Sequence, residues 1–389
     1  MSIKSKMSQY RTALMPQGSA LESVENSDAV ANLKQTIDQK MVLSEETLQK
    51  LRVDSDVPVK TVEKLTQAVQ TKGRRAIKAI HQGDEQYFVK HPKALDLLEV
   101  IVRTDGSRPS FLVKNGTVDL TGATDGLWKN ILLANKDRID KAIACVGRID
   151  RAGQQIGSGF LIGKNAIVTN LHVLQSIASK NNGVWKINED ATIDFGYEFQ
   201  GVKSINSREL KSVLFESGKP IDPAAIDHSK LDMAVIALEP LADDTGLLTL
   251  NFDGNINRQW TDNYIYTIGY PGNPGLAGLS NYGIVLEQLY QSTYGFKRLS
   301  PGQVLADDDM AAYHSICHDA STLGGNSGSV IIGAGKETAA AALHYGGTLA
   351  PPKQNWGHLL AATLEFKDKK TGTPLRTILK DQSTTIETV

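Results

Sequence analysis

The segment "TLGGNSGSVI", residues 322–331, surrounds one serine, Ser327, with three glycines and an asparagine. Glycine in an ordered element costs about 0.5–1 kcal/mol relative to alanine, so such a cluster indicates a tight turn or a close approach by another molecule. A serine hydroxyl acts as a nucleophile when a base takes its proton, a third group orients that base and donors stabilise the oxyanion. The chain should therefore also supply a histidine and an acid.

One histidine stands at the end of a predicted strand. The stretch "GSGFLIGKNAIVTNLHVL" predicts a hairpin with a turn at Lys164–Asn165, followed by a strand that delivers His172 at its end. A lone histidine in such a position is usually a surface residue or a satisfied core residue. Its interpretation as the base therefore depends on agreement with the other two motifs.

The acid is expected in "HSKLDMAVIALEP", where Asp232 stands just ahead of an apolar strand. A carboxylate at that place can be buried and aimed at an imidazole. Asp194 and Asp227 lie in the same span and remain alternatives. Neither of them stands just ahead of so apolar a strand, and Asp232 is therefore favoured.

The order of these residues along the chain distinguishes between folds. His172, Asp232 and Ser327 follow one another as histidine, aspartate and serine, which is the order of the two-barrel chymotrypsin type, whereas α/β-hydrolases run serine, acid, histidine. After Ser327 no histidine follows an aspartate, and "GNSGS" lacks the second glycine of the nucleophile elbow. The α/β-hydrolase interpretation therefore fails on both counts.

Three segments, "GSGFLI…TNLHV", "LDMAVIAL" and "STLGGNSGSVI", resemble the signatures of trypsin-like serine peptidases, and the resemblance covers about residues 143–366. Within that class, "STLGGNSGS" followed by "LHYGG" is similar to the glutamyl endopeptidases. The resemblance implies two six-stranded β-barrels with a triad of His172, Asp232 and Ser327 between them. It also implies an oxyanion hole formed by the backbone N–H groups of Gly325 and Ser327, a protein or peptide substrate, and no cofactor or metal.

The same resemblance places a specificity pocket at Ser321, Thr322 and His344. Thr322 and His344 match the positions with which glutamyl endopeptidases bind the carboxylate of the residue before the scissile bond, and a hydroxyl and an imidazole can both donate to an anion. Ser321 corresponds to the specificity aspartate of trypsin, so a preference for Lys or Arg is not expected. The alternative is that His344 merely packs beside the "YGG" strand.

The elements that must position these residues divide the chain into three parts. Residues 1–105 have helical spacing and predict a regulatory or adaptor region, and residues 106–142 predict a connector. Residues 143–389 predict the peptidase domain, because short β-rich runs alternate there with glycine, asparagine and proline turns. The expected fold is mainly β, two barrels preceded by a smaller helical region, and it ends in a short helix "TPLRTILK" and a frayed tail "DQSTTIETV".

Composition excludes several classes of function. Lys and Arg (42) nearly balance Asp and Glu (43), so no nucleic-acid partner is expected. No apolar run is long enough to cross a bilayer and the first residues lack a secretory pattern, which predicts a cytoplasmic protein with no membrane partner. Cys145 and Cys317 are too few for a disulfide framework and are expected to be small buried residues, although a single bridge stays open.

Two other clusters carry weaker signals. "HSICH" contains His314, Cys317 and His318, but residues four apart in a strand are about 13 Å apart and cannot share one zinc ion. His318 is instead expected to pack near the active-site loop. "KGRRAIK", residues 72–78, predicts a solvated helix face, with docking to an acidic partner as the minor alternative.

The overall prediction is a bacterial serine endopeptidase whose N-terminal helices recruit a regulatory protein partner or restrain the active site. The bacterial assignment follows from the resemblance, through the near absence of cysteine and the "GGNSGS" form of the motif. The alternative is a catalytically silent or signal-activated protein of the same fold that binds peptides or partners. Silent relatives usually lose a member of the triad, and none is missing here.

Overall fold

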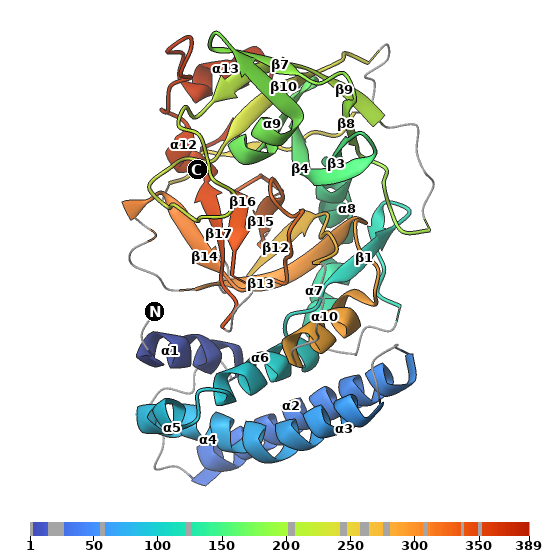
Figure 1. Ribbon diagram of the computed structural model, residues 1–389, viewed down its shortest axis with the longest axis vertical. Helices are drawn as coiled ribbons and strands as arrows, with labels where there is room; N and C mark the ends of the chain where they lie inside the picture. Colours follow the sequence, from blue (N-terminus) through green and yellow to red (C-terminus); the bar gives the residue numbers. More distant parts are fainter. Residues whose placement is uncertain are drawn as a thin grey trace. The chain divides into compact units, whose positions relative to one another are not determined.

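The chain divides into two compact units. A computed structural model (Figure 1) describes residues 3–14, 27–54, 59–121, 127–200, 207–241, 247–256, 264–274, 281–305, 310, 312–335, 338–348 and 352–388. The first unit, here called the helical unit, comprises Met1–Pro109, Gly275–Thr293 and Thr348–Gln354. The second, here called the barrel unit, comprises Ser110–Pro274, Tyr294–Gly347 and Asn355–Val389.

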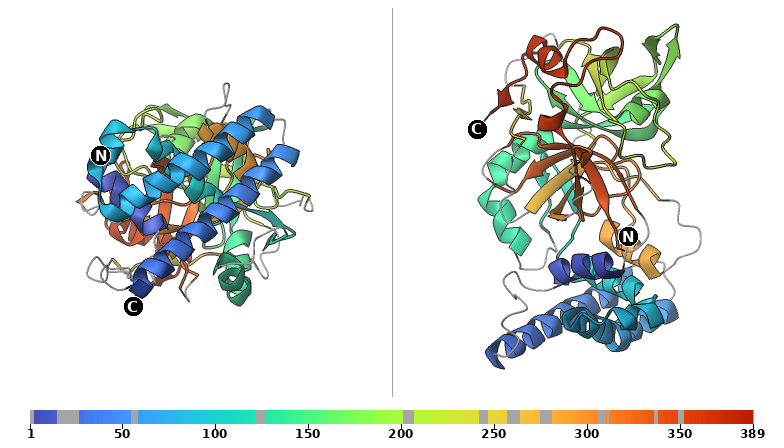
Figure 2. Two further views of the ribbon diagram at one scale, coloured as in Figure 1. Left: turned by 90° about the horizontal axis from the view of Figure 1, so that it is seen from below. Right: turned by 90° about the vertical axis from the view of Figure 1, so that its left-hand side faces the viewer.

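The helical unit is built from helices packed around one apolar helix. Its helical segments are α1 (Ile3–Leu14), α2 (Ser27–Asp54), α3 (Val59–Ala68), the π-turn η2 (Val69–Gly73), α4 (Arg74–Gln82), α5 (Glu85–Lys90), α6 (Ala94–Thr104) and α10 (Asn281–Tyr290). Helices α2 and α3 lie side by side (Figure 2). The sequence "ALDLLEVIVRT" of α6 is apolar on most of its faces, and every residue of α6 except Asp96 is buried. Such a helix forms the core of its unit, because a helix that is apolar all round must be covered on all sides.

The helical unit contains more than the region 1–105 that the sequence predicts. Two later segments of the chain, residues 275–293 and 348–354, also belong to it. Val285 of α10 is fully buried in the same apolar cluster as Leu98 and Ile101 of α6. The backbone N–H of Lys353 donates to Glu99 Oε2 at 3.2 Å. The sequence shows no boundary at either segment, since both lie within its β-rich part.

The first barrel is a closed antiparallel sheet of six strands. In order around the barrel they are β10 (Ala234–Leu238), β5 (Ala166–Thr169), β4 (Gln154–Ile162), β3 (Val146–Arg151), β8 (Ala191–Asp194) and β9 (Ser207–Glu216). The hairpin predicted around Lys164–Asn165 is confirmed, because β4 pairs with β5 and Phe160 lies opposite Val168. A separate hairpin is formed by β6 (Ala178–Asn181) and β7 (Val184–Ile187).

The second barrel closes through the pairing of β12 with β13. Its ring is β12 (Tyr264–Gly269), β15 (Val330–Gly333), β16 (Ala342–Gly347), β17 (Asn355–Leu359), β14 (Ser315–His318) and β13 (Arg298–Leu305). The expected fold of two six-stranded barrels preceded by helices is therefore confirmed.

Residues 106–142 do more than connect the two parts. They form β1 (Phe111–Lys114), β2 (Thr117–Val118), α7 (Leu127–Ala134) and most of α8 (Lys136–Ala144). Strand β1 pairs with β13 and so extends the sheet of the second barrel. Asn115 and Gly116 both have positive φ (52° and 75°), as the two central residues of a tight hairpin turn of type I′ require. Trp128 and Ile139 are buried in the barrel core.

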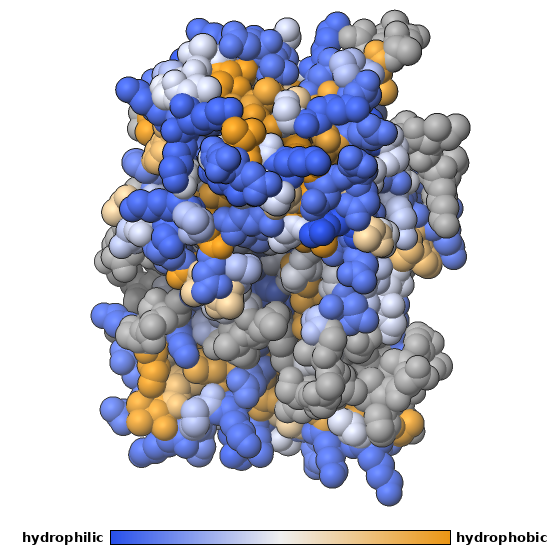
Figure 3. All heavy atoms as spheres, turned by 45° about the horizontal axis from the view of Figure 1, so that its top comes forward, coloured by the Kyte–Doolittle hydropathy of each residue, from blue (hydrophilic) through white to orange (hydrophobic). Residues whose placement is uncertain are grey.

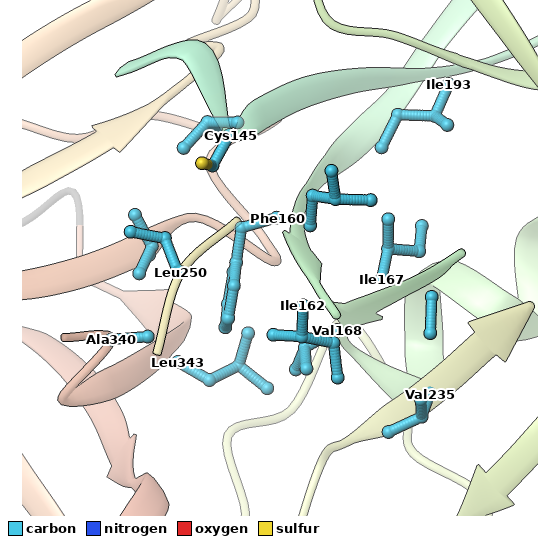
Figure 4. Close-up of a cluster of buried hydrophobic side chains, with 14 of the residues drawn as sticks. Cys145, Phe160, Ile162, Ile167, Val168, Ile193, Val235, Leu250, Ala340 and Leu343 are labelled. Atoms are coloured by element: carbon cyan, nitrogen blue, oxygen red, sulfur yellow. The ribbon is translucent and has the colours of Figure 1, made fainter. Parts of the chain in front are cut away.

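The barrel core contains one of the two cysteines. Figure 4 shows Cys145 beside Phe160 and Leu250 in this cluster. Cys145 and Cys317 do not form a disulfide with each other, and both are buried as small core residues. Burial raises the pKa of the Cys145 thiol to about 12, so the thiol stays protonated and unreactive at neutral pH.

The C-terminal segment differs from the frayed tail that the sequence predicts. The short helix is present as α13 (Leu375–Asp381), but β18 (Ile386–Glu387) pairs in parallel with β11 (Phe252–Asp253). The tail prediction is therefore wrong up to Glu387, because Phe252 and Ile386 pair across more than a hundred residues of sequence. Among the described residues this unit also contains the helices α9 (Leu171–Ile177) and α12 (Leu360–Thr363).

The surface is mainly polar on the face shown in Figure 3, where apolar patches lie between hydrophilic residues. Among the residues that the structure describes, no helix combines the length and the apolar character needed to span a bilayer.

Candidate active site

The loop that carries Ser327 contains two glycines that no other residue could replace without distortion. Gly325 has φ +89°, and an added Cβ would lie 2.7 Å from Tyr270 O and 2.9 Å from Gly272 N. Gly328 has φ +88°, and an added Cβ would lie 1.9 Å from Ser158 O. Both positions need the left-handed region and have no room for a side chain, which explains the glycine cluster.

The backbone N–H groups of this loop fall into two sets. Those of Asn326, Gly328 and Ser329 donate to carbonyl groups at 2.8–3.1 Å. Those of Gly325 and Ser327 donate to no acceptor within the described part of the chain. Two such groups close together in a tight loop can stabilise an anion such as the oxyanion of acyl transfer.

Strand β4 holds the loop in place. Ser158 N–H donates to Ser327 O at 2.7 Å, and the Ser158 hydroxyl donates to Gly325 O at 2.9 Å. At the preceding residue, Gly157, an added Cβ would lie 2.8 Å from the side chain of Val173 and 3.0 Å from Ser327 O. The backbone of Ser327 and the residue after His172 therefore both pack against the same point of β4.

His172 and Asp232 are in direct contact. His172 lies in the first turn of α9, its backbone N–H donates to Asp232 Oδ1 at 3.0 Å, and its ring Nδ1 lies 2.6 Å from Asp232 Oδ2. Asn170 Nδ2 donates to the backbone carbonyl of Asp232 at 2.9 Å. A carboxylate at Nδ1 favours the tautomer with the proton on Nδ1, which leaves Nε2 able to accept a proton.

The two alternative acids serve other partners. Asp194 Oδ1 accepts from Gly196 N–H at 2.8 Å, and Asp227 Oδ1 accepts from the Ser229 hydroxyl at 2.6 Å. Of the three aspartates considered, Asp232 is the one in contact with His172. Among the described residues no hydrogen bond joins the Ser327 hydroxyl to His172, and catalytic hydrogen bonds often tighten only when a substrate is bound.

The three expected pocket residues, Ser321, Thr322 and His344, are all buried. Thr322 Oγ1 donates to Asn355 Oδ1 at 2.5 Å. His344 Nδ1 lies 3.4 Å from His318 Nε2, and the two rings meet edge to face.

Asn355 was missed by the sequence analysis, because only the pairing of β17 with its neighbours places it beside Thr322. Its amide Nδ2 also donates to Ala320 O at 2.7 Å. His318 was expected near the active-site loop, and it lies against His344, whose carbonyl accepts from Gly328 N–H of that loop. In the described residues no cluster of three His, Cys, Asp or Glu side chains is arranged to hold a metal ion.

Comparisons with known proteins identify relatives of this chain. The family model described as a trypsin-like peptidase domain matches residues 157–337. A probable serine protease of Lysobacter enzymogenes is 30% identical over 297 residues, which are 71% of this chain and 76% of that protein.

Similar solved structures include a Glu endopeptidase (19% identity, TM-score 0.41, 58% of this chain and 88% of that one). A serine endoprotease from Yersinia pestis is also similar (16% identity, TM-score 0.39, 66% of this chain and 68% of that one). The family match and the Lysobacter relative together show that the chain belongs to the trypsin-like serine peptidases and is a serine endopeptidase.

Proposed function

We propose that this endopeptidase cleaves its substrate with Ser327 as nucleophile, His172 as general base and Asp232 as the group that orients the imidazole. The observation that carries this proposal is the double contact of Asp232 with the N–H and the ring of His172. Ser327 attacks the scissile carbonyl, His172 takes its proton and passes it to the leaving amine, and Asp232 stabilises the imidazolium. The N–H groups of Gly325 and Ser327 then donate to the oxyanion.

Covalent labelling tests this assignment. A fluorophosphonate should modify the native protein at Ser327, and Ser327→Ala and His172→Ala should abolish or strongly slow the labelling. Ser179→Ala is the matched control, because Ser179 is an exposed serine of the β6–β7 hairpin. A folded native protein that is not labelled would favour the silent peptidase-fold protein that binds peptides instead.

We further propose that the residue before the scissile bond is Glu or Asp. His344 supports this as the main donor, because an imidazole can donate to a carboxylate and its ring is held in place by His318. The Thr322 hydroxyl donates its one proton to Asn355 Oδ1, so it can donate to a substrate carboxylate only when that hydrogen bond is exchanged on binding. No acidic residue stands at position 321 to attract Lys or Arg.

A cleavage-site profile on a peptide library tests the preference. We expect cleavage after Glu or Asp, and His344→Gln should lower kcat/KM for acidic peptides about tenfold or more while sparing peptides with a neutral residue at that site. Cleavage after Arg or Lys would overturn the pocket assignment without affecting the triad.

We also propose that the helical unit controls activity. The segment Thr348–Gln354 belongs to this unit and directly joins β16, which carries His344, to β17, which carries Asn355. Glu99 holds this segment through Lys353 N–H, and the Glu99 carboxylate also accepts from Tyr10 and Arg103. If the packing of the helices changed, for example when a partner binds, this segment would move. The ends of β16 and β17 would then shift, because the segment is covalently joined to both strands.

A further inference from the structure

A second buried histidine contacts the proposed acid. His358 lies in β17 of the second barrel and is 2% exposed. Its Nε2 accepts the backbone N–H of Asp232 at 3.0 Å. Because a backbone N–H can only donate, Nε2 must be unprotonated, and the ring proton of the neutral imidazole must lie on Nδ1.

The neighbour on the other side of the ring agrees with this tautomer. Ser315 Oγ lies 3.1 Å from His358 Nδ1 and donates its own proton to Tyr313 O at 3.2 Å. A hydroxyl has one proton, so Ser315 accepts from His358 Nδ1–H. Both nitrogens of the imidazole therefore have a partner of the required kind.

His358 is also neutral at neutral pH. Burial lowers its pKa to about 4; Asp232 opposes this shift, and the nearby His228 and His314 add to it. The lone pair on Nε2 is therefore available to Asp232 at neutral pH.

Aromatic packing fixes the plane of the ring. The ring of Tyr345 in β16 stacks on His358 with centroids 4.1 Å apart and an interplanar angle of 13°. The Tyr345 hydroxyl in turn lies 2.7 Å from Nδ1 of His228, which precedes Asp232 by four residues. The imidazole can thus neither tilt nor slide without breaking one of these contacts.

Asp232 is consequently held at three places. Its carboxylate contacts His172 and its carbonyl accepts from Asn170, and both of these residues lie just after β5 of the first barrel. Its N–H donates to His358, which belongs to the second barrel, as does the loop of Ser327. A catalytic group must be held to within about 0.5 Å of its productive position. The hydrogen bond to His358 fixes Asp232 relative to the barrel that carries the nucleophile.

We propose that His358 is a positioning residue for peptide-bond hydrolysis: it aligns Asp232 with His172 and fixes that pair relative to the barrel that carries Ser327. This inference rests on the proposed role of Asp232 in catalysis. His358 itself does not touch the substrate and acts only through Asp232.

Two amide variants of the full-length protein test the inference. In His358→Gln the side-chain oxygen reaches the place of Nε2 and can still accept from Asp232 N–H. In His358→Asn the shorter side chain cannot reach it, so the N–H is left buried without an acceptor. Both variants remove the ring and its stacking on Tyr345, so a loss of stability from that cause is common to the two.

We expect His358→Asn to lower kcat, and the rate of fluorophosphonate labelling, about tenfold or more, with KM changed less than about twofold. His358→Gln should restore both rates to within about threefold of the native protein. Equal losses in the two variants, or no loss in either, would overturn the inference. Melting temperatures measured alongside show how much of any loss comes from unfolding.

A readout that needs no activity separates this inference from the proposed function. In Ser327→Ala protein, the downfield proton resonance of the His172–Asp232 hydrogen bond should persist with His358→Gln and shift or vanish with His358→Asn. If the resonance is the same in the His358→Gln and His358→Asn variants, the positioning role is overturned, even if the native protein is active. A native protein that is neither labelled nor cleaves peptides would refute the proposed triad instead, and the resonance would still decide whether His358 aligns Asp232.

Discussion

Replacing Gly325 by alanine tests the oxyanion hole through the backbone alone. At φ +89° an alanine costs about 1–2 kcal/mol more than glycine. Its Cβ would also lie 2.7 Å from Tyr270 O and 2.9 Å from Gly272 N, both of which are backbone atoms that cannot rotate away. The peptide that carries the Gly325 N–H must therefore move.

The expected loss follows from that movement. One oxyanion donor is typically worth about 2.7–4 kcal/mol of transition-state stabilisation, so Gly325→Ala should lower kcat about 10²-fold to 10³-fold. KM should change little, because the donor acts mainly on the transition state. The measurements are kcat and KM with a peptide chosen from the library, the rate of fluorophosphonate labelling, and the melting temperature.

Gly324 provides the matched control in the same loop. An added Cβ at Gly324 would meet no atom within 4 Å, and its φ lies outside the left-handed region. Gly324→Ala should therefore keep kcat within about threefold of the native value. If Gly325→Ala retains native kcat, or if both alanine variants lose activity equally, the assignment of the oxyanion hole is wrong.

Three further predictions concern the acid, pH and the helical unit. Asp232→Asn should lower kcat about 10⁴-fold at neutral pH with the fold intact, because the imidazole takes the wrong tautomer; steady-state kinetics and circular dichroism check this. The folded-state pKa of His358, about 4, is below its ordinary value, so the unfolded chain binds more protons than the folded chain between these two pKa values. The free energy of unfolding should therefore fall by up to about 3 kcal/mol as pH drops from 6.5 to 4. Urea unfolding should show this fall, and His358→Gln should reduce it. Val285→Asp should open the helical core, because α10 packs beside α6 and an aspartate cannot be buried there without cost. Proteolysis within residues 27–104 should then become faster. If the helical unit controls activity, KM should change as well.

Each of these predictions has an outcome that contradicts it. An Asp232→Asn enzyme with near-native kcat would remove the acid from the mechanism. A pH dependence of stability that is the same in the native protein and in His358→Gln would exclude His358 as its source. A Val285→Asp protein with native protease resistance but altered kinetics would place the effect outside the helical core.

Short-range sequence patterns were sufficient to predict two features that the structure shows at the candidate site. The apolar run after Asp232 and the strand before His172 are both present, and the two side chains meet. The glycines at 325 and 328 have the unusual backbone geometry that their density indicates.

Features that depend on long-range pairing were not accessible from the sequence. Asn355 and His358 look like ordinary strand residues until β17 pairs with β14 and β16, which brings one to Thr322 and the other to Asp232. The helix α10 was missed because its surroundings in the sequence are β-rich. Its buried face packs against α6, which lies about 180 residues earlier in the chain.

The central claim is that Ser327, His172 and Asp232 act together, and one structure tests it most directly. Full-length protein would be reacted with a peptidyl phosphonate that carries a glutamate side chain, and the adduct would be crystallised. We predict phosphorus bonded to Ser327 Oγ, with the phosphonyl oxygen about 3 Å from the N–H groups of Gly325 and Ser327, and His172 still joined to Asp232. An adduct on another residue, or a phosphonyl oxygen remote from both N–H groups, would contradict the account.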